Sequence, residues 1–363
     1  MQYVSRSALL AFALLLGACG GGNDNASITI AQPGVQKPGI LSISASPKQI
    51  PTTTAQDYLD AFNLGKNAGA RGQFTSLTWR EIEPTFGAPY DFHKVTEAVD
   101  FAAEQHGFAL LIGIQVINTT NREVPADLAG IQFNAAAMAT RFKAMLAQMI
   151  PLFEGRVRYL SIGNEVDVYL SANPSEWTPY KTFYDDVAAY ARTLDPNLRI
   201  GVTATADGAL GGNAALITSL NATSDVFIAT YYPLTPTFAV RAPSAPMSDF
   251  PVLLTAAGTK PIILQEVGYP SAATLGSSQE LQRQFVANVF SQWRNSNGRI
   301  AFLNYFLLHD VTQAQCDAFA LYYNVPGQNF KDFLCSLGLR AADGTAKIAW
   351  SQFVTSAIDA GLP

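Results

Sequence analysis

Eight short apolar runs recur between residues 41 and 307 of this 363-residue chain. Their starts lie about 26 to 49 residues apart, which leaves room for one helix and two loops after each run. The runs are nearly continuous in apolar character, as in strands of a parallel sheet whose two faces are both buried. They cover residues 41–45, 74–79, 108–116, 157–162, 200–205, 226–231, 262–265 and 300–307.

Helical patterns fill the gaps between these runs. Leu281, Phe285, Val289 and Trp293 recur every four residues, and Ser277–Glu280 before them matches a capping box. Other predicted helices cover 55–68, 95–104, 135–152, 182–194, 214–220 and 346–360. Eight alternating units predict an α/β fold, a (β/α)8 TIM barrel. A doubly wound open sheet is the alternative, but the glycine-rich phosphate loop expected of it does not occur in the sequence.

The first residues match an export signal. Arg6 supplies a positive charge, residues 8–16 are apolar, and Leu16–Cys19 resembles the processing box of bacterial lipoproteins. The resemblance implies cleavage before Cys19 and attachment of lipid to its sulfur. A transmembrane helix is disfavoured because the apolar stretch is too short, and an unmodified secretory signal is the other alternative.

We therefore predict three parts: a lipoprotein signal peptide over residues 1–18, a flexible tether over 19–38 and one barrel domain over 39–363. The tether is rich in Gly, Asn, Ala and Ser and holds too few large apolar residues to build a core. Gly20 follows Cys19, a pattern that resembles lipoproteins sent to the outer membrane of Gram-negative bacteria. The predicted location is the periplasmic or surface face of that membrane.

Composition narrows the classes of partner. Apolar residues make up 48% of the chain and charged residues 14%, which is typical of a well-packed globular domain. The net charge of −5 argues against nucleic acid. In an oxidising compartment Cys316 and Cys335 favour a disulfide, with two separate buried thiols as the alternative. The three histidines lack ligand spacing to the cysteines, so neither a metal nor an organic cofactor is predicted.

Two glutamates stand at the ends of predicted strands. Glu165 follows the run 157–162, and Glu266 follows the run 262–265. In a parallel barrel the carboxyl ends of all strands meet at one end, where active sites lie. Two carboxylates facing each other across a sugar-sized gap are what cleavage of a glycosidic bond needs. An isolated Asn-Glu pair also occurs at helix caps, so the second glutamate at a strand tip is what favours catalysis.

Segments at several strand tips resemble a large clan of retaining glycoside hydrolases with their acid/base and nucleophile on the fourth and seventh barrel strands. These segments are Leu77–Pro84, Ile162–Glu165, Thr230–Leu234 and Glu266–Pro270. The last two are similar to galactanase and β-mannanase families. The resemblance implies that Glu165 is the acid/base, Glu266 the nucleophile, and the substrate a β-linked polysaccharide or oligosaccharide of hemicellulose or β-glucan type.

The resemblance also implies roles for further residues. Asn164 would hydrogen-bond the sugar 2-hydroxyl, a contact that strengthens in the transition state. Tyr231 or Tyr232 would donate to Glu266. Arg80 would orient Glu266 or bind sugar hydroxyls, with an ion pair to Glu81 or Glu83 as the structural alternative.

Aromatic residues and one histidine complete the candidate site. Trp79, Trp177, Tyr169 and Phe306 lie at predicted strand tips or loops, where flat apolar faces can stack on sugar rings, although packing in the barrel wall is the structural alternative. His309 would touch substrate, with a loop-fixing hydrogen bond as its structural alternative.

The leading hypothesis is an exported, lipid-anchored retaining β-glycosidase. Carbohydrate is its predicted partner, and it meets the membrane only through the lipid anchor. The alternative is a non-catalytic glycan-binding lipoprotein on a barrel scaffold. Loop lengths favour an open mouth, and residues 311–337, pinned by Cys316–Cys335, would form one wall of it. The sequence specifies no oligomeric state.

Overall fold

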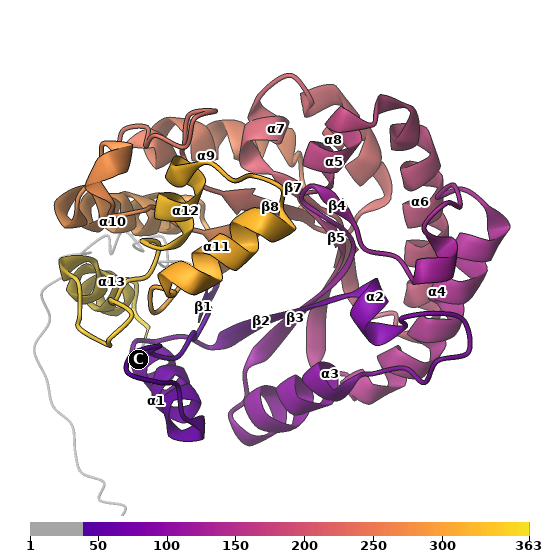
Figure 1. Ribbon diagram of the computed structural model, residues 1–363, viewed down its shortest axis with the longest axis horizontal. Helices are drawn as coiled ribbons and strands as arrows, with labels where there is room; N and C mark the ends of the chain where they lie inside the picture. The colour runs from indigo at the N-terminus through magenta and orange to yellow at the C-terminus, as the bar shows by residue number, and fades with distance from the viewer. Residues whose placement is uncertain (1–38, 363) are drawn as a thin grey trace, which may run out of the picture. The chain divides into compact units, whose positions relative to one another are not determined.

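The computed structural model describes residues 39–362, which form a parallel (β/α)8 barrel (Figure 1). The predicted signal peptide and tether, with Cys19, lie outside the described residues. All eight predicted runs are barrel strands, so the predicted fold class is confirmed. The strands are β1 (Ile40–Ile43), β2 (Gly72–Thr78), β3 (Ala109–Asn118), β5 (Val157–Asn164), β6 (Arg199–Gly201), β7 (Thr203–Thr205), β8 (Phe227–Tyr231), β9 (Ile262–Val267) and β10 (Ile300–Tyr305).

The barrel closes through its fifth strand, which is split into β6 and β7 around Val202. β6 pairs with β5, and β7 pairs with β8, while β1 pairs with both β2 and β10. The carboxyl ends of the parallel strands therefore meet at one end, which we call the mouth. A short strand, β4 (Asn121–Arg122), pairs antiparallel with the end of β3 at the mouth.

An outer layer of helices surrounds the strands (Figure 1). It consists of α1 (Ala55–Asn67), α3 (His93–Glu97) continued by the π-helix η1 (Ala98–Gln105), α4 (Ala136–Met149), α6 (Trp177–Leu194), α8 (Ala214–Leu220), α9 (Ala245–Ala256), α10 (Gln279–Asn295) and α13 (Ile348–Asp359). Shorter helices follow strand ends: α2 (Trp79–Ile82), α5 (Val166–Ala172), α7 (Ala206–Leu210), α11 (Gln313–Tyr322) and α12 (Gln328–Leu334). Single 3₁₀ turns are η2 (Ala126–Leu128), η3 (Ile150–Phe153), η4 (Pro174–Glu176), η5 (Asn221–Thr223) and η6 (Ala273–Leu275).

The sequence missed some helices, and for different reasons. α9 carries Pro246 in its first turn and Pro251 in its interior, where proline normally argues against a helix. α11 and α12 fall in the segment that was predicted only as a wall. α6 begins at Trp177, before the predicted start at residue 182.

The predicted capping box at Ser277–Glu280 is wrong by one residue. Ser278 is the N-cap of α10, and its hydroxyl accepts from the amide of Leu281. Ser277 instead donates to the carbonyl of Pro270, and Glu280 pairs with Arg283. The helix therefore starts one position later, and position N3 holds an apolar residue that cannot return a hydrogen bond.

The barrel interior has two layers with opposite chemistry. The lower layer is apolar and includes Leu111, Tyr159, Ile228, Ile263 and Phe302. The polar layer above it lies nearer the mouth, and its side chains are at most 1% exposed. It contains Ser42, Ser161, Thr203, Gln265 and Asn304. The polar layer is the floor on which the residues at the strand tips stand.

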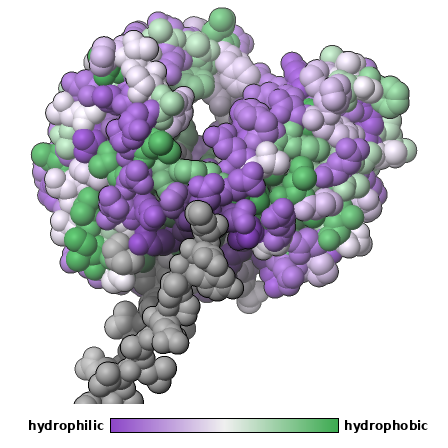
Figure 2. All heavy atoms as spheres, turned by 90° about the horizontal axis from the view of Figure 1, so that it is seen from below, coloured by the Kyte–Doolittle hydropathy of each residue, from purple (hydrophilic) through white to green (hydrophobic). Residues whose placement is uncertain are grey.

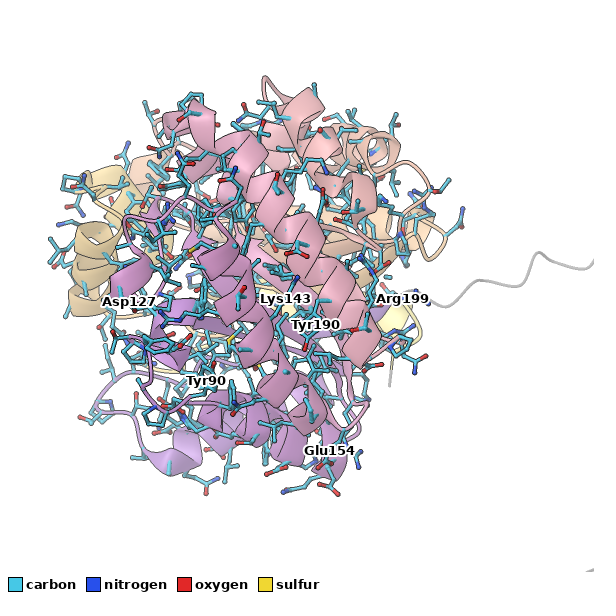
Figure 3. The ribbon with its side chains drawn as sticks, turned by 90° about the vertical axis from the view of Figure 1, so that its right-hand side faces the viewer. Tyr90, Asp127, Lys143, Glu154, Tyr190 and Arg199 are labelled. Atoms are coloured by element: carbon cyan, nitrogen blue, oxygen red, sulfur yellow. A yellow bond between two sulfur atoms is a disulfide. The ribbon has the colours of Figure 1, made fainter. Side chains whose placement is uncertain are left out.

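Outside the barrel, a larger apolar core lies between strands and helices. On the side drawn in Figure 3, α4 and α6 pack together, and the Lys143 ammonium lies 5.8 Å from the centre of the Tyr190 ring. The face in Figure 2 shows hydrophilic residues interspersed with separate hydrophobic ones. None of the helices within residues 39–362 is both long and apolar enough to cross a membrane.

The lower layer predicts a large stability effect at Phe302, which is fully buried. Phe302→Ala is expected to lower the free energy of unfolding by about 3–5 kcal/mol, because it removes apolar contacts and leaves a cavity. Chemical denaturation followed by circular dichroism measures this loss. Phe86→Ala is the matched control, since Phe86 is 76% exposed, and it is expected to cost less than about 1 kcal/mol. Equal losses in the two variants would contradict the packing described for the barrel interior.

Candidate active site

Glu165 stands at the tip of barrel strand four, directly after β5. It is the N-cap of α5 and adopts a left-handed backbone conformation with φ of 46°. Such a conformation is uncommon for a residue other than glycine and recurs at functional sites. Gly163 allows the turn, because a Cβ there would lie 2.3 Å from the hydroxyl of Tyr180.

Two threonine hydroxyls hold the Glu165 carboxylate from opposite sides. Thr119, after β3, donates to Oε2 at 2.7 Å, and Thr230 of β8 donates to Oε1 at 2.7 Å. Glu165 is therefore directed over the barrel mouth, with its rotamer fixed by strands three and six. Neither threonine was predicted from the sequence.

Glu266 lies at the tip of barrel strand seven, in β9. The hydroxyl of Tyr232 donates to its Oε2 at 2.6 Å. Glu266 pairs in register with Thr230, the residue that binds Glu165, so the two glutamates share one site. Of the two tyrosines proposed to support Glu266, the structure selects Tyr232. Tyr231 is buried on the other side of β8, where its hydroxyl donates to Asp249.

The two carboxyl groups are electrostatically coupled. Burial, and then the negative charge of Glu165, raises the pKa of Glu266 to about 7, against an ordinary value of 4.5. The hydrogen bond from Tyr232 opposes this rise. Burial also raises the pKa of Glu165, and the charge of Asp207 adds to it. Because each ionisation disfavours the other, the two carboxyl groups do not titrate independently.

Two aspartates extend the negative field around Glu165. Asp167 is 2% exposed and accepts from the amide and hydroxyl of Thr205 at 2.7 and 2.6 Å. Burial raises the pKa of Asp167 to about 6, with the charge of Glu165 adding to the rise. Asp207 lies beyond strand five with its side chain 57% exposed, and Arg241 approaches it at 4.0 Å. Asp207 is therefore a carboxylate near Glu165 that solvent or a ligand can reach.

A chain of buried side-chain amides lies directly below the glutamates. Asn164 donates to Asn118 at 3.0 Å and accepts from Gln265 at 2.7 Å. Gln265 in turn accepts from Thr203 at 2.8 Å. Asn164 is 5% exposed, so its orientation is fixed by this chain while it stays beside Glu165. Its predicted contact with a sugar hydroxyl stays a prediction.

The structure contradicts two predicted sugar-stacking residues. Trp79 is fully buried, with its indole nitrogen donating to Glu83 at 3.2 Å and its ring against Phe142. Its ring faces the helix layer because Trp79 begins α2 instead of continuing the strand. Trp177 is 8% exposed and belongs to the same core, as the first residue of α6. Both tryptophans stabilise the wall of the barrel.

Arg80 and His309 are also placed away from the predicted contacts. Arg80 makes no contact with Glu266, and its ion pair is with Glu123 at 3.5 Å instead of Glu81 or Glu83. It also donates to the carbonyl of Val124. His309 is 3% exposed, with Nδ1 at 2.7 Å from the carbonyl of Ser46, which corresponds to its structural alternative of fixing a loop. Burial lowers the pKa of His309.

Two other aromatic side chains border the site, namely Phe306, which was among the predicted residues, and Tyr323. Phe306, after β10, packs edge-on against Tyr232 with 6.3 Å between ring centres. Tyr323, in the loop after α11, lies near both glutamates: burial first, and then the charges of Glu165 and Glu266, raise its pKa. The barrel rule would have found Asn118 and Thr119, since both follow the third apolar run, but no local pattern indicates Tyr323.

Among residues 39–362, no cluster of three or more His, Cys, Asp or Glu side chains is placed to hold a metal ion. The two cysteines in this part of the chain, Cys316 and Cys335, form a disulfide.

Solved structures similar to this chain are glycoside hydrolases with a (β/α)8 barrel. An exo-β-1,4-mannosidase, Op5Man5 from Opitutaceae bacterium strain TAV5, matches 88% of this chain with a TM-score of 0.66 and 16% identity. This chain spans 59% of that protein. GH5_18 from Streptomyces cattleya, in complex with GlcNAc, matches 90% of this chain and 81% of its own, with a TM-score of 0.67 and 12% identity.

The GH53 catalytic domain of Ignisphaera aggregans matches 89% of this chain and 97% of its own, with a TM-score of 0.58 and 16% identity. No protein-family model and no curated protein sequence matches the chain. At these identities the likeness establishes the shared barrel fold.

The raised pKa of Glu266 predicts a cost in stability that depends on pH. Between pH 4.5 and about 7 the folded protein holds a proton on this group that the unfolded chain releases, so stability falls as pH rises through this window. Glu266→Gln removes the group whose ionisation causes this fall in stability. It is therefore expected to raise the free energy of unfolding at pH 8 by about 1–2 kcal/mol, with little change at pH 4.

Denaturation at the two pH values measures this difference. Glu97→Gln is the matched control, because Glu97 is an exposed glutamate in α3. A Glu266→Gln variant that is less stable than the parent protein at pH 8 would sink the prediction.

Proposed function

We propose that this protein is a retaining β-glycoside hydrolase in which Glu165 is the acid/base and Glu266 the nucleophile. The observation that carries the proposal is the coupled pair of carboxyl groups at the tips of barrel strands four and seven, joined through Thr230. The barrel shared with glycoside hydrolases supports it. Two of the similar proteins act on or bind β-mannosides by name, so β-mannosides come first among candidate substrates.

In the first step, Glu266 attacks the anomeric carbon with a carboxylate oxygen while the glycosidic C–O bond breaks. The proton on Glu165 moves to the departing oxygen, and a glycosyl ester of Glu266 forms. The step requires the proton on Glu165 and an ionised Glu266, because the acid must be neutral while the nucleophile carries the charge.

In the second step, Glu165 takes a proton from water as the water attacks the anomeric carbon. The ester bond breaks, the sugar leaves with its original configuration, and Glu266 is free again. The Tyr232 hydroxyl fits this cycle, since its hydrogen bond to Oε2 favours an ionised Glu266 before attack and after release.

Asp207 and Asp167 fit the assignment of the acid. Their negative charge near Glu165 disfavours a second carboxylate there, and so favours the protonated form of Glu165. The two threonine hydroxyls oppose this tendency, which leaves Glu165 able to both donate and recover a proton.

Trapping of the glycosyl ester tests the nucleophile. The 2,4-dinitrophenyl 2-deoxy-2-fluoro-β-glycosides of mannose, glucose and galactose serve as probes, because the fluorine slows both steps and the good leaving group keeps the first step fast. The protein mass is expected to rise by one fluorosugar, and peptide mapping should place the label on Glu266.

Controls separate the possible outcomes of this trapping. Glu266→Gln should take no label, while Glu165→Ala should lose at least 100-fold on alkyl glycosides and much less on dinitrophenyl glycosides, whose leaving group needs no proton. A label on Glu165 would reverse the two roles, and an inverted product would contradict retention. A folded protein that binds glycans but hydrolyses none of them would favour the glycan-binding alternative.

We also propose that the protein is exported and anchored in the outer membrane through lipid on Cys19. The support is the sequence alone, namely the apolar segment followed by Leu16–Cys19. In a Gram-negative host, labelled palmitate should enter the wild-type protein and not Cys19→Ala. Equal labelling of both would contradict the anchor.

A further inference from the structure

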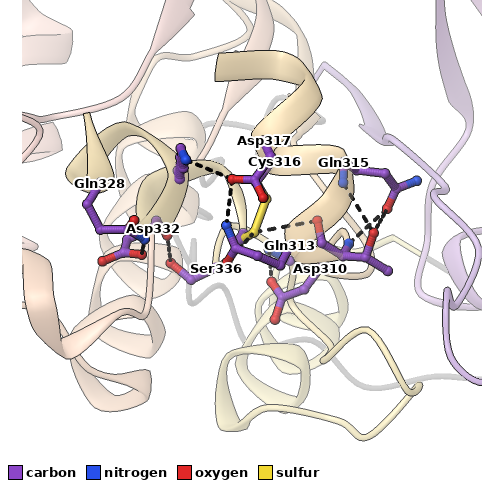
Figure 4. The surroundings of a disulfide bond; sticks show 12 residues. Asp310, Gln313, Gln315, Cys316, Asp317, Gln328, Asp332 and Ser336 are labelled. Atoms are coloured by element: carbon purple, nitrogen blue, oxygen red, sulfur yellow. Dashed lines mark hydrogen bonds and ion pairs between the residues drawn. A yellow bond between two sulfur atoms is a disulfide. The ribbon is translucent and has the colours of Figure 1, made fainter. Parts of the chain in front are cut away.

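α11 and α12 form a single unit between the last strand and the last helix. The disulfide Cys316–Cys335 joins them, and Lys331 pairs with Asp317 at 2.8 Å beside it (Figure 4). Because covalent and ionic links act together, neither helix can move far without the other. We call residues 311–337, which contain both helices, the bridge.

One end of the bridge is fixed to the loops after barrel strands six and seven. The ring of Phe330 packs 5.1 Å from that of Phe238, after β8. Asn329 donates to the carbonyl of Thr237 at 2.8 Å. Thr274, after β9, donates to Asp332 at 2.6 Å.

The other end reaches the loop after strand three. The Tyr322 hydroxyl donates to Glu123 at 2.7 Å and accepts from Asn118 at 3.0 Å. Thr120 donates to the carbonyl of Tyr323, and Asn121 to that of Tyr322. Glu123 and Asn118 are 7% and 6% exposed, so the Tyr322 hydroxyl satisfies two buried groups.

These two ends lie across the mouth from each other. In the closed strand order, β3 and β9 are separated by three barrel strands on either side. Near its start, α11 also contacts the loop after strand one, where Gln315 donates to Gln49 at 3.1 Å. Figure 1 shows α11 running across the inside of the helix ring. The bridge therefore separates the tips of β10, β1 and β2 from those of β5, β7 and β8.

The glutamates face the second of these sides. The hydroxyls that hold them come from Thr119, Thr230 and Tyr232, on strands three and six. The exposed Asp207, after strand five, and the half-buried Arg241, after strand six, are polar groups on the same side. Tyr323 stands on the bridge itself, and its carbonyl accepts from Thr120, the neighbour of the Thr119 that holds Glu165.

We propose that the bridge closes the mouth on the side of β10, β1 and β2, so that the site takes only the end of a β-linked glycan chain and releases sugars from that end. Tyr323 forms the wall against which the terminal sugar rests. This inference rests on the proposed hydrolase function. A polysaccharide bound at an internal bond would have to continue on both sides of the glutamates, and the bridge occupies one of those paths.

The pattern of products tests this inference. The full chain is given β-1,4-linked hexasaccharides of mannose, glucose and galactose, labelled at the reducing end, together with dyed cross-linked polysaccharides of the same three sugars and 4-nitrophenyl β-glycosides. Turnover of one nitrophenyl glycoside is expected, with stepwise shortening of the matching hexasaccharide and no release of dye. Dye release, or internal fragments as first products, would overturn the bridge proposal and leave the hydrolase function intact. Absence of hydrolysis of every substrate would overturn both.

Variants on the bridge give a second readout. Tyr322→Ala removes the anchor on strand three, and is expected to raise the fraction of internal cuts at least tenfold. Tyr323→Ala is expected to lower kcat/KM on the nitrophenyl glycoside at least tenfold. Leu321→Ala is the matched control, since Leu321 is 83% exposed on the same helix, and it should change neither quantity. Thermal melting of each variant separates these effects from loss of fold, and an unchanged product pattern in a folded Tyr322→Ala would contradict the role of the bridge.

Discussion

The carboxamide of Gln265 connects the strands directly beneath the two glutamates. It donates to Asn164 on strand four and accepts from Thr203 on strand five, while its backbone carbonyl accepts from Asn304 on strand eight. Gln265 is 1% exposed, so leaving any of its polar groups without a hydrogen-bond partner would destabilise the folded protein. These hydrogen bonds therefore constrain the relative positions of four strands. Glu165 directly follows Asn164 in the sequence, and Glu266 directly follows Gln265. The positions of the two glutamates therefore depend on these hydrogen bonds.

Above this floor the site is electrostatically unfavourable to the folded state. Glu165 and Glu266 disfavour each other's charge, and Asp167 adds a buried carboxylate two residues from Glu165. Such a group of acids costs stability above neutral pH, and the apolar core on both faces of the barrel has to offset it. In the proposed mechanism the same repulsion disfavours two carboxylates at once, which suits a step that needs one neutral acid and one ionised nucleophile.

Sequence patterns predicted the barrel and the positions of both glutamates because strand periodicity and the strand-tip rule depend only on local order. They did not determine side-chain direction at the tips. Tyr231 and Tyr232 are adjacent, and alternation along β8 sends one into the helix layer and the other to Glu266. Because the register between β8 and β9 shifts, the sequence alone does not show which of the two tyrosines points toward Glu266. Trp79 was misplaced because a helix starts at it.

The sequence predicted that residues 311–337 form one wall of the mouth, but not that they cross it. The contacts that fix the bridge to the loop after strand three join residues about 200 positions apart in the chain. The same Asn118 that accepts from Asn164 also donates to Tyr322, so the floor of the site and the bridge share one hydrogen-bond network. Lifting the bridge would leave Glu123 and Asn118 with fewer partners in a buried setting, at a cost of about 1–3 kcal/mol for each group. A substrate that crossed the mouth would have to offset that cost with contacts of its own, whereas a chain end would not. The proposed preference for chain ends therefore depends on the same network that positions Asn164.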